Sequence, residues 1–212
     1  MTVAALYVQK GGAYYGLPDV DPWDEERDAR NYSGPWPVVA HPPCARWSAL
    51  AGLVQHVYGY KIGDDGGCFE AALLAVRRFG GVLEHPAGTR AWTHFGLPRP
   101  ATNGGWTVTL DGESVCYVEQ GAYGGPSRKP TWLYASGIEL PPLRWSSRRR
   151  REGDAEWWVG KDHPRRPDAA RRMRGAKASA TPVEFRDELL GMARSALPSL
   201  AIIPPARACN LR

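Results

Sequence analysis

The sequence predicts an α/β protein with a partly parallel sheet, and two observations carry this prediction. Apolar runs typical of strands alternate with helical segments between residues 37 and 84, and one of these helices leads through two glycines into the next apolar run. A hydrophobic share of 43% supports a real core in a chain of 212 residues. We divide the chain into an α/β domain (1–143), a basic segment (144–180), a C-terminal helix (181–197) and a tail (198–212).

The first half of the chain supplies the alternation. Residues 4–8 and 37–40 read as buried strands, residues 45–58 are a candidate helix, and residues 82–84 form a third strand. Between residues 8 and 21, glycines and a proline leave no room for a normal helix. A helix is expected over 68–79 because its apolar side chains share one face, and two glycines end it. This face comprises Cys68, Ala71, Ala72, Ala75, Val76 and Phe79.

The second half predicts a hairpin and a last helix. Residues 114–118 and 131–134 are expected as antiparallel strands on either side of a glycine-rich segment. Thr181-Pro182-Val183-Glu184 has the pattern of a capping box with proline at the first helical position. The apolar stripe that follows, which should pack on the body, consists of Phe185, Leu189, Met192, Ala193 and Ala196.

The charge is unevenly distributed. The chain carries a formal net charge of +5, and the stretch from Arg144 to Lys177 has twelve Lys or Arg against five Asp or Glu. This stretch alone has a net charge of +7, which leaves −2 for the rest of the chain. A near-neutral body with one strongly basic segment predicts a polyanionic partner such as DNA, although a solvated charge run has the same composition.

The cysteines and the hydropathy exclude several classes of protein. Cys44, Cys68, Cys116 and Cys209 show no paired spacing, and no apolar stretch is long enough to cross a bilayer. We therefore expect free thiols, a cytoplasmic location and no membrane partner. No metal is expected, because no second ligand pair accompanies His41 and Cys44 at zinc-site spacing. A zinc nucleobase deaminase would also need a second cysteine three residues after Cys44.

A thiol and a carboxylate follow two of the predicted strands. Two prolines stiffen the backbone before Cys44, and Glu84 closes the strand at 82–84. Ligands of α/β sheets bind at the carboxyl ends of the strands, so the two groups suit nucleophilic attack on a pyrimidine ring. The alternative is that Cys44 is a buried small hydrophobe and Glu84 a solvated acid. A hydrolase that pairs Cys44 with a histidine is a further possibility, with His41, His85 or His94.

Three segments, in this order, resemble the cytosine-C5 DNA methyltransferase family, particularly its short bacteriophage-type members. Pro42-Pro43-Cys44 resembles the family's nucleophile motif, and residues 82–86 with Gly88 resemble its Glu-Asn-Pro or Glu-Asn-Val motif, with His85 in place of asparagine. Residues 123–132 resemble its basic motif before a late strand. The resemblance covers about residues 37–134 and implies a Rossmann-like, methyltransferase-type mixed sheet with flanking helices and a truncated N-terminal half.

The resemblance also implies a mechanism. Cys44 would add to C6 of a cytosine flipped out of DNA, Glu84 would hold N3, and Arg128 would contact the pyrimidine carbonyl, the thiol or a phosphate. A nearby arginine, or a helix that starts after Cys44, would lower the pKa of the thiol. The other residues expected to contact the substrate or nucleic acid are Pro43, Arg46, His85, Pro86, Tyr123, Lys129, Arg148, Arg149, Arg165 and Arg166.

The cofactor implied by the resemblance is S-adenosylmethionine. Gly11 and Gly12 would be a remnant of its glycine loop, and Asp21 or Asp24 would bind its ribose, although all four residues equally suit a loop with turns. Two alternatives therefore stay beside a methyltransferase. One is a pyrimidine-modifying enzyme that uses another donor or a nucleotide substrate, and the other is an inactive DNA-binding relative. A phage-encoded protein of this kind would act in the cytoplasm of the bacterial host.

Overall fold

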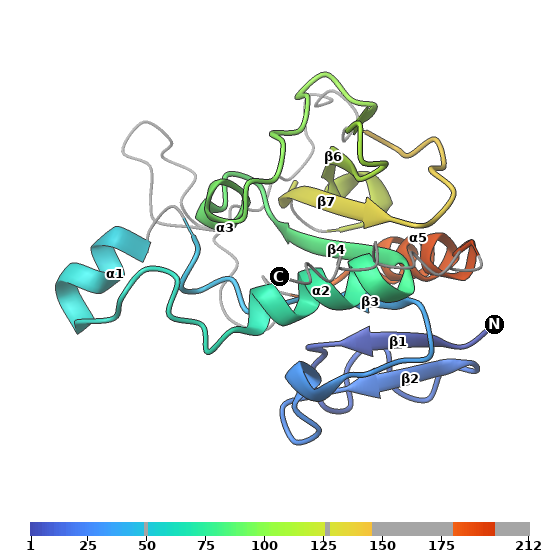
Figure 1. Ribbon diagram of the computed structural model, residues 1–212, viewed down its shortest axis with the longest axis horizontal. Helices are drawn as coiled ribbons and strands as arrows, with labels where there is room; N and C mark the ends of the chain where they lie inside the picture. Colours follow the sequence, from blue (N-terminus) through green and yellow to red (C-terminus); the bar gives the residue numbers. More distant parts are fainter. Residues whose placement is uncertain (49–50, 126–127, 146–179, 198–212) are drawn as a thin grey trace, which may run out of the picture.

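The structure is a computed structural model that describes residues 1–48, 51–125, 128–145 and 180–197. One seven-stranded sheet has the order β2-β1-β3-β4-β7-β6-β5 (Figure 1). The strands are β1 (Val3–Leu6), β2 (Val20–Trp23), β3 (Val38–Ala40), β4 (Gly81–Pro86), β5 (Trp106–Val108), β6 (Ser114–Glu119) and β7 (Pro130–Ser136). The α-helices are α1 (Ala51–Tyr58), α2 (Cys68–Phe79), α3 (Arg90–His94) and α5 (Val183–Arg194), with 3₁₀ helices η1 (Ala29–Asn31) and η2 (Gln120–Tyr123).

The sheet is mixed, as the sequence predicts. Strands β1 to β4 run parallel, whereas β7 is antiparallel to both β4 and β6. In the pair β3–β4, Ala40 lies beside Leu83, so the two strands end at the same edge. Helix α1 protrudes beyond this edge of the sheet (Figure 1). The α/β class and the antiparallel hairpin of β6 and β7 are therefore confirmed.

Two helices cover opposite faces of the sheet. Side chains alternate along a strand, so Ala4 of β1 packs in the core under α2, while Ala5 packs in the core under α5. The predicted apolar face of α2 is confirmed in part, because Ala72, Ala75 and Val76 are buried as expected. The buried face also includes Phe69 and Leu73, whereas Cys68, Ala71 and Phe79 are only partly buried. The predicted stripe of α5 is confirmed, because the helix buries Phe185, Leu189, Leu190, Met192 and Ala193.

The turn from α2 into β4 explains the glycine pair. Gly81 has a φ of 129°, and a Cβ atom at this position would lie 2.0 Å from the carbonyl oxygen of Val38. Strand β4 therefore reaches its place beside β3 only because residue 81 has no side chain.

The connection from β1 to β2 contains no helix, as predicted, but β2 itself was not predicted. It contains Pro22, which lacks an N–H group, and it lies at the edge of the sheet, where such a residue is tolerated. The short helix α3 and the edge strand β5 were likewise not predicted from the sequence.

Two helices differ from the prediction at their N-terminal ends. The candidate helix over 45–58 is confirmed in part by α1, which is described from Ala51 on, whereas residues 45–47 form a turn in which the N–H of Trp47 donates to the carbonyl of Cys44 over 3.0 Å. The capping box does not form: α5 begins at Val183, and no side chain caps it. The Glu184 carboxylate instead pairs with Arg144, whose Nη2 lies 2.8 Å away.

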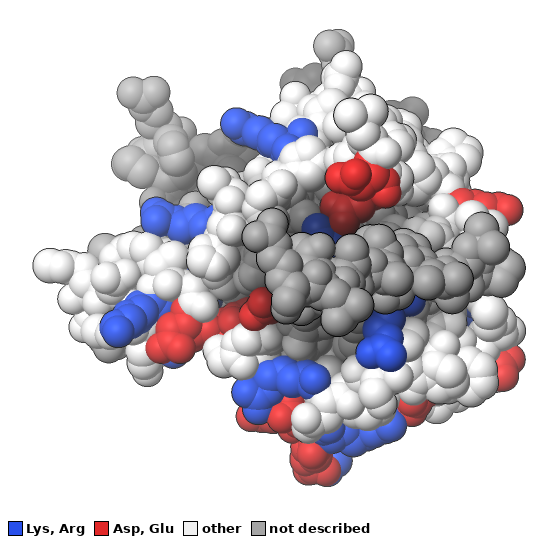
Figure 2. Space-filling model, viewed as in Figure 1, with Lys and Arg blue, Asp and Glu red and all other residues white. Residues whose placement is uncertain are grey.

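Charged side chains of both signs lie on the described surface. On the face in Figure 2, basic and acidic side chains are interspersed. Among the described residues, no helix has the length and apolar composition needed to span a membrane. Nearly all of the basic segment, including Arg148, Arg149, Arg165 and Arg166, lies outside the described residues, so its contact with DNA stays a prediction.

Candidate active site around Glu84

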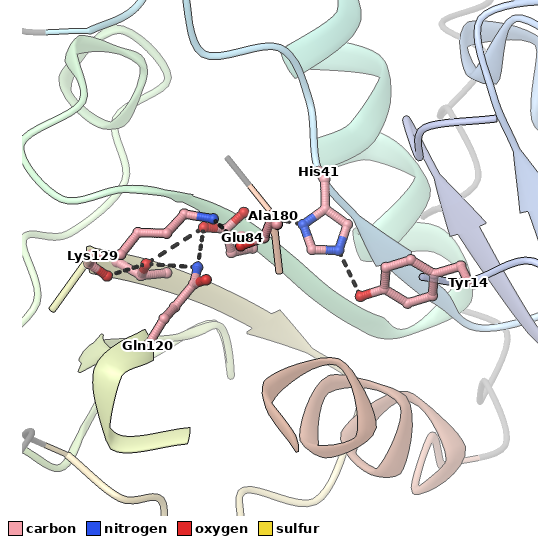
Figure 3. Close-up of polar contacts among 7 residues, drawn as sticks. Tyr14, His41, Glu84, Gln120, Lys129 and Ala180 are labelled. Carbon is pink, nitrogen blue, oxygen red and sulfur yellow. Dashed lines mark hydrogen bonds and ion pairs between the residues drawn. The ribbon is translucent and has the colours of Figure 1, made fainter. Parts of the chain in front are cut away.

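A buried carboxylate, Glu84 of β4, is the centre of a polar cluster (Figure 3). Its Oε2 atom lies 3.0 Å from Nδ1 of His41, and its Oε1 atom accepts a hydrogen bond of 3.0 Å from Nε2 of Gln120. The hydroxyl of Thr131 lies 3.1 Å from the same Gln120 nitrogen and 3.5 Å from Oε1 of Glu84. Donors therefore hold both oxygens of a buried side chain, which is 10% exposed.

The register of the sheet brings these residues together. His41 follows the last residue of β3, whose partner in β4 is the residue before Glu84. On the other side, Glu84 pairs with Leu133 of β7, so Thr131, two residues away, is its diagonal neighbour on the same face. Gln120 begins η2 directly after β6. The cluster thus joins the parallel and antiparallel halves of the sheet.

Glu84 is ionised near neutral pH. Burial by itself would raise the pKa of its carboxyl group, but the hydrogen bond from His41 and the charge of Lys129 bring the pKa down to about 2. Because the ionised carboxylate only accepts hydrogen bonds, Nδ1 of His41 carries the proton that it shares with Oε2.

Cys44 lies in the turn after β3, and the residue is exposed. Neighbouring protein atoms nevertheless displace part of the water around its sulfur. Their desolvation raises the pKa of the thiol, the charge of Glu84 raises it further, and the charge of Lys129 opposes this effect. The expected lowering of this pKa is therefore wrong. The guanidinium of Arg46 lies 3.6 Å from the ring centroid of Tyr60.

The other residues of the predicted basic motif have identifiable contacts. Arg128 donates from Nε to Oε1 of Glu119 over 3.1 Å. Nζ of Lys129 lies 3.4 Å from the carbonyl oxygen of Ala180, and its charge acts on both Glu84 and Cys44. Tyr123 is buried, and its hydroxyl accepts a hydrogen bond of 2.9 Å from the backbone N–H of Arg144.

His85 occupies the aromatic core under α2 rather than the Glu84 cluster. It is fully buried, and its ring centroid lies 5.1 Å from that of Phe69 and 6.4 Å from that of Trp92. Burial lowers the pKa of His85 to about 4, against the opposing charge of Glu84, so the imidazole is neutral near pH 7. Pro86 ends β4, and Pro43 is exposed beside Cys44.

The carboxylates expected to bind the ribose of S-adenosylmethionine already have partners in their own loop. Asp21 accepts hydrogen bonds from Arg27 over 2.5 Å and from the indole of Trp23 over 2.9 Å. Asp24 accepts from the Tyr15 hydroxyl and from the backbone N–H groups of residues 26 and 27. Both carboxylates thus stabilise the loop, and their role toward a cofactor stays a prediction.

The glycine pair of that loop is also accounted for. The N–H of Gly12 donates to the carbonyl of Gln9 over 2.9 Å, and Gly11 has a φ of 66°. This hydrogen bond and the left-handed backbone of Gly11 form a tight turn after β1. Gly11, Gly12, Asp21 and Asp24 therefore match the alternative of a loop with turns.

Sequence reasoning missed three members of the cluster: Tyr14, Gln120 and Thr131. A signal was available for Gln120, which is a polar residue directly after an apolar strand. His41 was considered only as a metal ligand or a hydrolase base. In the described residues, no three His, Cys, Asp or Glu side chains form a group that could hold a metal ion.

The comparisons with known proteins give no family. The chain has no significant match to a protein-family model, to a curated protein or to a solved structure.

Proposed function

We propose that this protein modifies a pyrimidine base, most simply cytosine in DNA, through a transient bond between Sγ of Cys44 and C6 of the ring. The observation that supports this proposal is that the charge of Glu84 raises the pKa of the exposed Cys44 thiol. The two groups therefore influence one another at the shared edge where β3 and β4 end. Open α/β sheets bind their ligands at such an edge, and a Rossmann-like methyltransferase-type sheet is part of the proposal.

The addition needs one proton to move. As the S–C6 bond forms, the π electrons of C5=C6 shift to C4–C5, and those of C4=N3 move onto N3, which takes up a proton. At rest the Cys44 thiol holds a proton, while the Glu84 carboxylate does not. The proton that sulfur loses is thus balanced by the one that N3 gains, and Glu84 accepts the N3–H hydrogen bond in the adduct.

The adduct makes C5 nucleophilic toward an electrophile. S-adenosylmethionine is the electrophile that the family resemblance implies, but the carboxylates at the expected positions are already bound within their own loop, so we derive no methyl transfer. One reaction needs no donor at all. C5 takes a proton from water, the original C5 hydrogen leaves as a proton, and the thiolate is expelled. The net result is exchange of the C5 hydrogen with solvent.

DNA is proposed as the substrate because of the resemblance and the basic segment 144–177. A base in a duplex has to leave its stack before Cys44 reaches C6, which costs a few kcal/mol. A single-stranded substrate or a nucleotide avoids this cost, so the three substrates are compared directly.

The test is release of tritium to water from cytosine labelled at C5. Duplex DNA, single-stranded DNA and deoxycytidine monophosphate are each incubated with the protein without any methyl donor. Release is expected from at least one substrate, is lost in Cys44→Ser, and persists in the matched control Cys68→Ser. No release from any of them by the folded wild-type protein would overturn the proposal in favour of an inactive relative.

A further inference from the structure

Glu84 belongs to a row of three hydrogen-bonded side chains. The row runs from β4 through His41, which follows β3, to Tyr14 in the loop between β1 and β2. The Tyr14 hydroxyl lies 2.8 Å from Nε2 of His41, and Nδ1 of His41 lies 3.0 Å from Oε2 of Glu84 (Figure 3). Tyr14 is 3% exposed, and the side chains of His41 and Glu84 are 13% and 10% exposed. These bonds are therefore largely shielded from competing water.

The row accommodates His41 in both of its protonation states. In the neutral ring, Nδ1 donates to Glu84 and Nε2 accepts from the Tyr14 hydroxyl. In the charged ring, Nε2 donates, and the same hydroxyl oxygen accepts. Burial and the charge of Glu84 raise the pKa of Tyr14 well above its usual value, so the phenol keeps its proton in either state. Neither hydrogen bond has to break when His41 gains or loses a proton.

The loop that carries Tyr14 is fixed to the body of the protein. Tyr14 lies in the core under α5, and Nη1 of Arg186 on that helix donates to the carbonyl of Ala13 over 2.8 Å. The loop connects β1 to β2, which is the place where the family resemblance expects a cofactor loop. Its tyrosine instead reaches the Glu84 cluster.

We propose that His41 and Tyr14 are positioning residues for Glu84, and that the β1–β2 loop serves the base site instead of a methyl donor. His41 holds the Oε2 oxygen of the carboxylate, and Tyr14 holds the imidazole. The kinetic test of this inference rests on the proposed function, because it measures tritium release. The NMR test does not depend on that function.

The charged and titratable groups around this row come from three parts of the chain: the segment before β7, strand β4 and helix α5. Lys129 precedes β7 and acts on Glu84, as does His85 of β4. On α5, Arg186 and Asp187 act on Tyr14 with opposite signs. A pH profile of the wild type thus reports on all of them, and only matched variants isolate His41.

The matched pair of variants is Tyr14→Phe and Tyr15→Phe. Each removes one hydroxyl from the same loop, but the Tyr15 hydroxyl donates to Asp24, outside the row. We expect Tyr14→Phe to lower kcat for tritium release by about tenfold with little change in KM, because a misplaced catalytic group costs rate rather than binding. Tyr15→Phe should leave kcat unchanged. Equal kcat values for both variants and the wild type would overturn the role of Tyr14.

His41 is tested by two substitutions. His41→Asn keeps an N–H donor near the position of Nδ1, whereas His41→Ala removes it. Because the His41 hydrogen bond lowers the pKa of Glu84, its loss should move the acid limb of the kcat profile to higher pH in His41→Ala and much less in His41→Asn. A merely structural role would change the amplitude of the profile but not its position. Coincident acid limbs in all three proteins would overturn the proposal.

A measurement without turnover separates this inference from the proposed function. Nitrogen-15 NMR of the full chain should show a proton on Nδ1 of His41, and Tyr14→Phe should shift the Nε2 resonance. A proton on Nε2, with Nδ1 bare, would overturn the positioning role even in an active protein. Failure of tritium release in the wild type, with the proton on Nδ1 present, would instead overturn the proposed function alone.

Discussion

Nε2 of Gln120 donates to Oε1 of Glu84 over 3.0 Å, and this bond ties η2 to β4 inside the molecule. Gln120 is fully buried and supplies a donor to the carboxylate oxygen that His41 does not contact. A buried carboxylate remains ionised only if such donors replace water. The bond from Gln120 therefore adds to the bond from His41 in replacing the water that the buried carboxylate has lost.

Removing the Gln120 amide should destabilise the protein. Gln120→Met keeps the volume but leaves a buried charge without one donor, which costs about 1.5–3 kcal/mol of the free energy of unfolding. Urea denaturation at pH 7 measures this loss. The control Gln9→Met removes an exposed amide and should change the stability by less than about 0.5 kcal/mol. Equal stabilities of the two variants would contradict the prediction.

Glu84 should make stability depend on acid pH. Its pKa falls from 4.5 to about 2 on folding, so its contribution is complete above pH 4.5 and is lost as the pH falls toward 2. The shift corresponds to about 3 kcal/mol. We expect the difference in free energy of unfolding between wild type and Glu84→Gln to shrink over this range, as measured by denaturant titrations at several pH values. A difference that does not vary with pH would show that Glu84 is not held ionised.

The reactivity of Cys44 should respond to the charge of Glu84. Because that charge raises the pKa of the thiol, Glu84→Gln should increase the thiolate fraction at pH 8 and speed alkylation by iodoacetamide. Mass spectrometry of the Cys44 peptide over time gives the rate. Glu113→Gln removes a carboxylate that pairs with Arg77 on the other side of the fold and serves as the control. Faster alkylation in both variants would point to loosened structure rather than to charge.

S-adenosylmethionine should not bind through Asp24. This carboxylate already accepts from the Tyr15 hydroxyl and two backbone N–H groups. Isothermal titration calorimetry of the full chain should give no heat that depends on Asp24, and Asp24→Asn should leave tritium release from cytosine unchanged. Binding in the wild type that disappears in Asp24→Asn would restore the ribose role for this residue.

Helix α5 should be essential to the fold rather than appended to it. Leu189 is fully buried under the sheet, so Leu189→Ala should cost about 2–5 kcal/mol of the free energy of unfolding. Val183, on the same helix, is 58% exposed, and Val183→Ala should change the stability by less than about 0.5 kcal/mol. Thermal and urea denaturation measure both values. If α5 is part of the fold, each variant should unfold in a single transition. A small effect of Leu189→Ala would contradict it.

Local signals predicted part of the fold. The helix over 68–79 could be predicted from its apolar periodicity, and the turn into the next strand from its two glycines. Both signals depend on a few neighbouring residues only. Strand β2 was missed because Asp21 and Pro22 disfavour strands, and its existence depends on pairing with β1. The capping box failed because Glu184 is taken by Arg144, forty residues earlier in the chain.

The candidate site could likewise be predicted from the sequence only in part. That Cys44 follows the strand parallel and adjacent to that of Glu84 could be predicted from the alternation of strand and helix. Glu84 was expected to close its strand, but it lies inside β4, two residues before Pro86 ends that strand. The sign of the Cys44 pKa shift could not, since it depends on how far the fold desolvates the sulfur and on how near it brings the charge of Glu84. Tyr14 was beyond sequence reasoning, because its place in the cluster depends on the path of an irregular loop.

The packing of α5 on β1, β3 and β4 also constrains biosynthesis. The strands near the N-terminus leave the ribosome first, but the helix that covers one of their faces is translated some 140 residues after Val39. Until residues 183–194 emerge, that apolar face lacks the helix that covers it. The growing polypeptide is then a natural client for chaperones that shield exposed apolar surface during translation.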